Sequence, residues 1–191
     1  MRMPRMKLAA EPRVVAISTV LVAAGFILGI WAVSASLDQS WLDGHASERA
    51  GSERDSSFET NGSIPAIFFR NMTVVAFLFS GVATGGLTTF MAVTIVSLAV
   101  GTTGAIINTT QGWHETISQI VSYAPFEFSG LIVAGAAGVY PLICTVLGRN
   151  SRNGDHVVRR YMNSLPATLL LLVASTILIM MGAIFESFVI G

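Results

Sequence analysis

Long apolar runs separated by short polar segments dominate the hydropathy pattern of this chain. The longest uncharged stretch runs from Met72 to Gly112 and contains no Asp, Glu, Lys, Arg or His. An apolar helix needs about 20 residues to cross the hydrocarbon core of a bilayer, so this stretch is long enough for two crossings. Gly85-Gly86 and Thr88-Thr89 supply the tight turn between them. The pattern predicts spans at about residues 71–87 and 89–109.

Three further apolar runs predict three more spans, at residues 14–36, 128–147 and 166–189. The first resembles a signal peptide, because Ser34-Ala35-Ser36 is similar to a cleavage site. It is longer than the ~7–15 apolar residues of such a signal, so we interpret it as a retained helix. Pro166 suits the first turn of the last helix. The chain is therefore predicted to be all-α, a polytopic integral membrane protein of five transmembrane helices in a single membrane domain.

Three polar segments connect these spans. Residues 37–64 are rich in acidic, serine and glycine residues and predict an exposed loop that can dock a partner. Residues 111–123 place apolar side chains at helical spacing and predict a short interfacial helix. Residues 148–164 form a basic loop. Because short cytoplasmic loops carry an excess of Lys and Arg, the N-terminus and this basic loop are predicted inside. The C-terminus and the acidic loop are then extracytoplasmic.

Composition supports the membrane assignment. Of the 191 residues, 52% are hydrophobic and 12% are charged, against about 25% charged in average soluble chains. The net charge is zero, which gives no indication of a nucleic-acid partner. A single cysteine, Cys144, excludes an intramolecular disulfide. It lies in an apolar run, where a thiol behaves as a small hydrophobic group.

Polar residues from three separate stretches are predicted to meet near the outer side of the membrane. Arg70 and Asn71 begin the second span, Glu127 precedes the fourth, and Glu186 lies near the end of the fifth. Ionisable groups in a membrane are costly, are usually paired and often mark a site. One interpretation is an ion pair that only pins the helices together. The other is a polar pocket for a peptide, a lipid headgroup or a protein partner.

Catalysis is a further hypothesis for the two glutamates, because two carboxyl groups in different environments can perform acid–base chemistry. No specific motif places a nucleophile beside Glu127 or Glu186, so the chain is expected not to be an enzyme. There is no glycine-rich phosphate loop and no His-Glu-x-x-His motif. His45, His114 and His156 are scattered along the chain. We therefore expect no metal site and no cofactor.

Small residues one helical turn apart predict close helix packing, because they let helix backbones approach each other within the bilayer. Such residues occur in the first, second and fourth predicted spans; they are Gly25, Gly29, Gly81, Gly85, Gly135 and Gly138. The fourth span also carries the run Ala134-Gly-Ala-Ala-Gly138, which predicts a flat helix face.

The order of these features resembles the stage II sporulation protein M family of bacterial and archaeal membrane proteins. The resemblance rests on Gly-Phe-Ile-Leu-Gly in the first span, on Arg70-Asn71-Met72, and on Phe126-Glu127-Phe128 before the small-residue run. It also includes Ala183-Ile-Phe-Glu-Ser-Phe-Val189 at the end. The family's asparagine before the second span is matched by Asn71.

The family's Pro-His-Gly-x-x-Glu motif aligns with Ser122-Tyr-Ala-Pro-Phe-Glu127, in which only the glutamate is retained. Tyr123 stands at the position of the family's histidine. The resemblance thus implies a substrate- or partner-binding role for Arg70, Asn71, Tyr123, Glu127 and Glu186. It also implies residence in the cell membrane of a prokaryote.

Three functions follow from this resemblance. The leading hypothesis is a non-enzymatic membrane scaffold or accessory subunit that recruits partner proteins on the outer side. The first alternative is an accessory component for export, maturation or immunity of a circular bacteriocin-like peptide or of a lipid, working with an ATP-binding subunit. The second is a membrane-embedded enzyme that processes or cyclises peptides. The expected partners are membrane lipid and either a second copy or another membrane protein.

Overall fold

All described elements of the protein are helices. The computed structural model describes residues 10–37, 64–112, 114, 117, 121, 124–147 and 157–190, and this part of the chain contains no strand. The helices are α1 (Pro12–Ser36), α3 (Ile64–Phe79), α4 (Gly81–Thr84), α5 (Leu87–Gln111), α7 (Ala124–Leu147) and α8 (Val157–Ile190). Five spans are long and apolar enough to cross a membrane: α1, α3 with α4, α5, α7 and α8. The predicted all-α fold with five membrane spans is confirmed.

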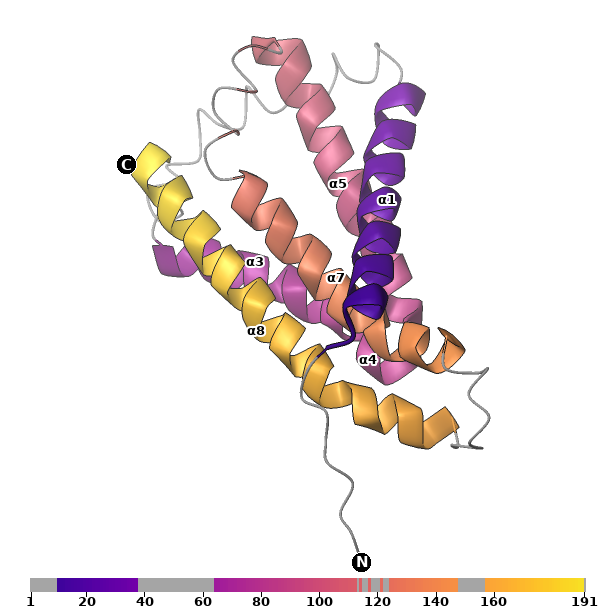
Figure 1. Cartoon of the computed structure of the whole chain (residues 1–191). Helices are drawn as coiled ribbons and strands as arrows, with labels where there is room; N and C mark the ends of the chain where they lie inside the picture. The colour runs from indigo at the N-terminus through magenta and orange to yellow at the C-terminus, as the bar shows by residue number, and fades with distance from the viewer. Residues whose placement is uncertain are drawn as a thin grey trace, which may run out of the picture.

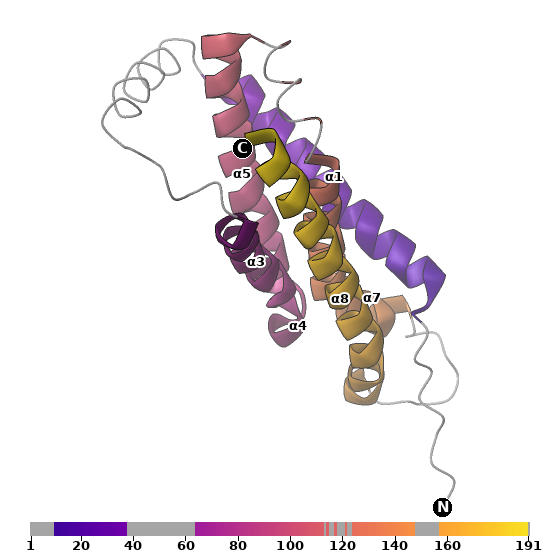
Figure 2. The ribbon, with the colours of Figure 1, turned by 90° about the vertical axis from the view of Figure 1, so that its left-hand side faces the viewer.

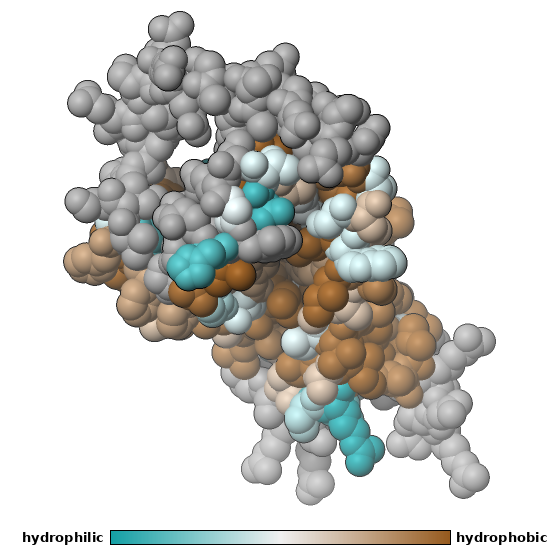
Figure 3. Space-filling model, turned by 90° about the horizontal axis from the view of Figure 1, so that it is seen from above, coloured by the Kyte–Doolittle hydropathy of each residue, from teal (hydrophilic) through white to brown (hydrophobic). Residues whose placement is uncertain are grey.

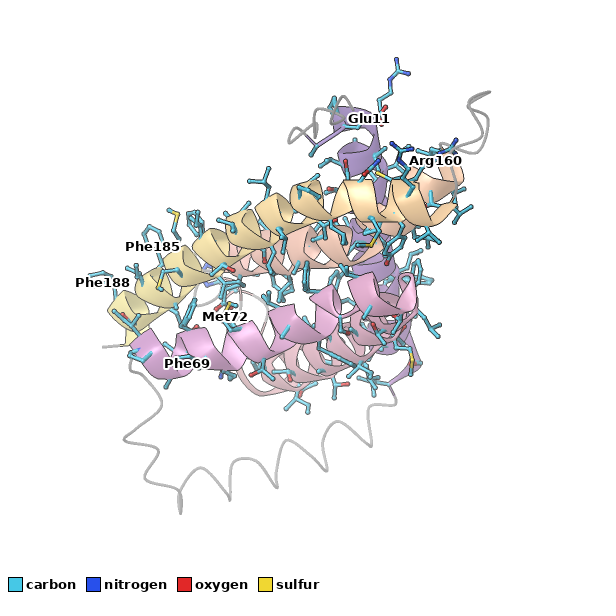
Figure 4. The ribbon with its side chains drawn as sticks, turned by 90° about the horizontal axis from the view of Figure 1, so that it is seen from below. Glu11, Phe69, Met72, Arg160, Phe185 and Phe188 are labelled. Atoms are coloured by element: carbon cyan, nitrogen blue, oxygen red, sulfur yellow. The ribbon has the colours of Figure 1, made fainter. Side chains whose placement is uncertain are left out.

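The five spans run alternately up and down, so each end of the bundle collects residues from distant parts of the sequence (Figure 1). Figure 4 shows Phe69 of α3 with Phe185 and Phe188 of α8 at one end, and Glu11 and Arg160 at the other. We call these the Glu186 end and the Glu11 end. The starts of α3 and α7 and the ends of α1, α5 and α8 lie toward the Glu186 end.

α7 is the central helix of the bundle. The residues from Ala134 to Pro141 are all buried, on every side of the helix. A helix that is apolar all round is enclosed by neighbours, and here α1, α3, α4, α5 and α8 all contact α7. Figure 2 shows α7 alongside α8. The small residues therefore let neighbouring helices pack on all sides of α7, and not only on the single flat face that was predicted.

Glycines set the close approach of α1 to its neighbours. A Cβ added at Gly25 would lie 3.2 Å from Val93 Cγ1 of α5, and one at Gly29 would lie 2.5 Å from Ser97 Cβ. α7 also packs closely on α1: a Cβ at Gly135 of α7 would lie 2.7 Å from a methyl group of Val22 of α1. Gly29 and Gly135 therefore have no room for a larger residue, and Gly25 is tightly packed, which agrees with helix contacts made at small residues.

Thr89 forms a second packing centre, where α4, α5 and α7 meet. Its buried hydroxyl donates a hydrogen bond to the Leu78 carbonyl oxygen at 2.6 Å. A Cβ on either Gly81 or Gly138 would overlap the Thr89 hydroxyl, and one on Gly138 would also overlap the Leu78 carbonyl. The two glycines thus leave the space that a polar contact between helices requires.

Gly85 does not act as a packing glycine. No atom lies within 4 Å of the position where its Cβ would be, and its φ of +65° lies in the left-handed region. Gly85 ends α4 as its C-cap, and Gly86, with φ of +93°, continues the turn into α5. Left-handed residues at helix C-termini are usually glycines because they lack a Cβ. The predicted turn was right, and the predicted packing role of Gly85 was wrong.

Two spans begin earlier than the hydropathy pattern predicted. α3 begins at Ile64 instead of residue 71, and α7 begins at Ala124 instead of residue 128. Each has a proline as its second residue, Pro65 and Pro125. Proline suits the first helical turn because its missing N–H needs no partner there. Pro125 therefore begins a helix rather than breaking one, and Glu127 lies inside the first turn of α7.

The last helix also starts earlier, at Val157, so Pro166 lies inside α8 and not in its first turn. A helix of this length spans about 50 Å at 1.5 Å per residue, which exceeds the ~30 Å hydrocarbon core. The turns before Pro166 extend beyond the length that crossing requires. Proline bends helices that it interrupts, and Figure 1 shows α8 changing direction in this part.

Several predicted features lie outside the described residues. They are most of the acidic loop at 37–64, most of the interfacial helix at 111–123 and the first half of the basic loop at 148–164. The surface of the described part is largely apolar, as Figure 3 shows for the view from above. Large side chains such as Val20, Ile27 and Leu169 are exposed along the helices. Such a surface suits contact with lipid.

We predict that Gly138→Ala destabilises the protein by about 1–3 kcal/mol, the usual cost of overpacking a core. The added methyl group meets the Leu78 carbonyl, a backbone atom that cannot move aside cheaply. The measurement is reversible unfolding in mixed micelles. Gly104→Ala is the matched control, because nothing lies within 4 Å of its Cβ position. Equal unfolding midpoints for the two variants would contradict close packing around Thr89.

Candidate functional site

Three helices bring polar side chains together at the Glu186 end. Arg70 and Asn71 lie in the second turn of α3, Glu127 lies in the first turn of α7, and Glu186 lies in the last turns of α8. α7 and α8 are neighbours that run in opposite directions, so the start of α7 meets the end of α8. α3 contacts both of these helices. The alternating direction of the spans thus delivers these four residues to one level, and we call them the carboxyl cluster.

An interhelical hydrogen bond joins α3 to α7. The side-chain amide of Asn71 donates from Nδ2 to Oε1 of Glu127, across 56 residues of sequence. The first turn of a helix also favours an acidic residue, because its free N–H groups carry partial positive charge. Glu127 therefore has two sources of stabilisation at this position.

An ion pair joins α3 to α8. Arg70 Nη2 lies 3.7 Å from Oε1 of Glu186. The two partners differ sharply in environment, because the Arg70 side chain is 69% exposed whereas the Glu186 side chain is 9% exposed. The second oxygen of Glu186 is buried and has no hydrogen-bond partner among the described residues. Burying a polar oxygen without a hydrogen-bond partner is costly.

The two glutamates lie side by side, and the carboxyl of Glu186 is close enough to interact with that of Glu127. Two carboxylates at such a distance repel each other unless donors or positive charges flank them. Asn71 flanks one carboxyl and Arg70 flanks the other. The cluster is therefore a single electrostatic unit in which removing either flanking group exposes the repulsion.

Gly182 makes room for this arrangement and was not predicted from the sequence. It lies one turn before Glu186 on α8, and a Cβ added there would be 2.7 Å from Cγ of Glu127. The spacing of four residues places Gly182 and Glu186 on the same face of α8. This spacing was the signal in the sequence. It could be interpreted only once Glu127 was known to pack against this face of α8.

An aromatic pair also went unpredicted. The rings of Phe126 and Phe185 stack with centroids 4.9 Å apart and planes inclined by 12°. Each phenylalanine directly precedes a glutamate of the carboxyl cluster. Stacked aromatic pairs contribute about 0.5–1.5 kcal/mol beyond their area burial. The ring pair thus helps to hold the start of α7 against the end of α8.

The structure brings together Arg70, Asn71, Glu127 and Glu186, as the sequence predicted. Tyr123, the remaining predicted site residue, lies outside the described residues. His114 is described but exposed. Within the described ranges, no group of three or more His, Cys, Asp or Glu residues could hold a metal ion.

Comparison with known proteins gives one match. Residues 18–189 match the family model of stage II sporulation protein M, which covers nearly the whole chain. No curated protein and no solved structure matches the chain. The resemblance predicted from the sequence is therefore confirmed.

We predict that Gly182→Ala destabilises the protein by about 1–3 kcal/mol through overpacking against Glu127. In a Glu127→Ala background the Cγ atom is gone, so the same substitution should cost much less. The measurement is the unfolding free energy of both single variants and the double variant in micelles. An equal cost of Gly182→Ala in both backgrounds would contradict the packing of Glu127 on α8.

Proposed function

The chain belongs to the stage II sporulation protein M family, and on that premise we propose that it is a non-enzymatic membrane scaffold or accessory subunit. It recruits a partner protein at the Glu186 end, which we place on the extracytoplasmic side. This orientation rests on the positive-inside rule applied to the basic N-terminal segment and the basic loop at 148–164. The partner is another membrane protein or a second copy of the chain.

The observation that carries this proposal is that three exposed side chains, Phe69, Arg70 and Phe188, lie at the Glu186 end of the bundle; we call them the Arg70 surface. Phe69 is 69% exposed and Phe188 is 79% exposed, and Figure 4 shows both rings at the Glu186 end. Phe69 directly precedes Arg70 on α3. Arginine and aromatic side chains are enriched among the residues that dominate binding energy in protein interfaces.

Arg70 pairs with Glu186, and most of its side chain is still exposed. Its guanidinium group has five N–H donors, and its ion pair with Glu186, at 3.7 Å, is longer than a hydrogen bond. The anchored side chain loses less conformational freedom on binding than a free one would. A carboxylate or backbone carbonyl of a partner could accept hydrogen bonds from the N–H groups of Arg70. An acidic or carbonyl-rich segment beside an apolar helix is thus the partner chemistry that suits this surface.

The carboxyl cluster supports a positioning role rather than catalysis. Glu127 accepts a hydrogen bond from Asn71, and one oxygen of Glu186 pairs with Arg70, so both residues contact α3. We propose that the cluster fixes the end of α8 against α3 and α7, which in turn fixes Phe69, Arg70 and Phe188. Loss of a processed peptide in Glu127→Gln, with expression and assembly intact, would instead favour the peptide-processing alternative.

We predict that a photo-crosslinking amino acid at position 69 gives protein adducts in native membranes, and that Arg70→Gln reduces their yield. The matched control is position 31, because Trp31 is also aromatic and also 69% exposed, but lies on α1. Adducts are read by gel shift and mass spectrometry. A shift to the mass of two chains would identify a second copy as the partner.

Two outcomes would contradict the proposal. One is that position 69 yields only lipid adducts, as a purely lipid-facing residue would. The other is that positions 69 and 31 yield the same protein adducts irrespective of Arg70, which would indicate collisions without a docking surface.

A further inference from the structure

Each glutamate of the carboxyl cluster has one oxygen engaged with α3. Oε1 of Glu127 accepts the hydrogen bond from Asn71, and Oε1 of Glu186 pairs with Arg70. The other oxygen of Glu186, Oε2, is buried and has no hydrogen-bond partner among the described residues. An ionised carboxylate has only acceptor oxygens, so a second carboxylate nearby cannot satisfy this atom. The contact between the two glutamates therefore lacks a donor.

The charges around the pair do not balance two carboxylates. Asn71 is neutral, and Arg70, the charged residue of α3, has a mostly exposed side chain whose charge is screened by solvent. α5 contains no ionisable residue, and His114, which follows it, is exposed. The other ionisable residues of α1, α7 and α8 lie toward the Glu11 end: Glu11, Arg13, Tyr140, Cys144, Arg159, Arg160 and Tyr161.

A proton supplies what this contact lacks. Two carboxyl groups held close together share one proton, because two adjacent negative charges are costly where water is scarce. A protonated carboxyl group has an O–H donor, so it converts a repulsive contact between two acceptors into a hydrogen bond. Oε2 of Glu186 is shielded from solvent, and a proton reaches such an atom without needing the space of a water molecule or an ammonium group.

We propose that Glu127 and Glu186 share one proton in the folded protein at neutral pH, and that this proton forms a hydrogen bond between α7 and α8. The proton belongs to the pair, because strongly interacting groups titrate together. Glu127 is partly exposed at the end of the bundle, so the proton can exchange with the medium. The inference concerns the carboxyl cluster itself and does not depend on a partner at the Arg70 surface.

Infrared spectroscopy tests the shared proton directly, because a protonated carboxyl group has a C=O stretching band that a carboxylate lacks. The wild type in micelles at neutral pH is compared with Glu127→Gln and Glu186→Gln. Each substitution keeps the size of the side chain and removes one acid, so the remaining carboxyl group ionises beside α3. Glu11→Gln is the matched control, because Glu11 is exposed and lies at the other end of the bundle.

The expected result is a carboxylic acid band in the wild type and in Glu11→Gln, and loss of that band in both cluster variants. The unfolding free energy of the wild type should also fall as the pH rises from neutral to mildly alkaline, because the folded pair then releases a proton that the unfolded chain does not hold. Glu127→Gln should lose less over the same range. Circular dichroism confirms that each variant is folded, and if one fails to fold, the other decides the outcome.

A wild type without the band at neutral pH would overturn the proposal, because both carboxyl groups would then be ionised. So would a band that persists in either folded cluster variant, because a single carboxyl group would then hold a proton without its neighbour. If neither variant folds, the wild type decides alone, and an unfolding free energy that does not fall with rising pH overturns the proposal. Crosslinking at position 69 reports the proposed function separately.

Discussion

The hydrogen bond from Asn71 to Glu127 is the interaction on which the Glu186 end of the bundle depends. In a membrane, the hydrophobic effect does not drive helices together, so packing and interhelical hydrogen bonds must do so. A carboxyl group so close to the bilayer core is tolerated only when it is paired. Asn71 supplies the donor for Glu127, and Arg70 supplies the positive charge for Glu186. Removing Asn71 would leave two adjacent carboxyl groups with a single, largely exposed counter-charge.

The rest of the fold brings these groups within reach. α7 lies at the centre, because its run of glycine and alanine lets five other helices approach its backbone. Thr89, between Gly81 and Gly138, fixes the turn from α4 into α5. At the Glu186 end, Gly182 leaves room for Glu127 to pack against the face of α8 that also carries Glu186. The same principle operates at both places: a missing side chain makes room for a polar contact between helices.

Much of this could be predicted from the sequence, and the exceptions have physical causes. The uncharged run from Met72 to Gly112 and the other apolar stretches predicted five spans, because hydropathy alone identifies a crossing. Helix boundaries were less predictable: Pro166 was placed in the first turn of its helix, and α3 and α7 begin before their apolar runs, because helix ends depend on local contacts. The convergence of Arg70, Asn71, Glu127 and Glu186 followed from the parity of the crossings. The packing role of Gly182 and the stacked pair of Phe126 and Phe185 depend on helix rotation, which hydropathy does not specify.

A double-mutant cycle on Asn71 and Glu127 measures the central interaction most directly. Asn71→Leu, Glu127→Met and the double variant are compared with wild type by reversible unfolding in mixed micelles. Interhelical hydrogen bonds in a membrane protein contribute about 0.6 kcal/mol on average and about 1.7 kcal/mol at most. The account predicts a favourable coupling energy at or above that average, because Glu127 also lies against Glu186, so its removal relieves the contact between the two carboxyl groups. Additivity within about 0.3 kcal/mol, the behaviour of independent sites, would contradict it.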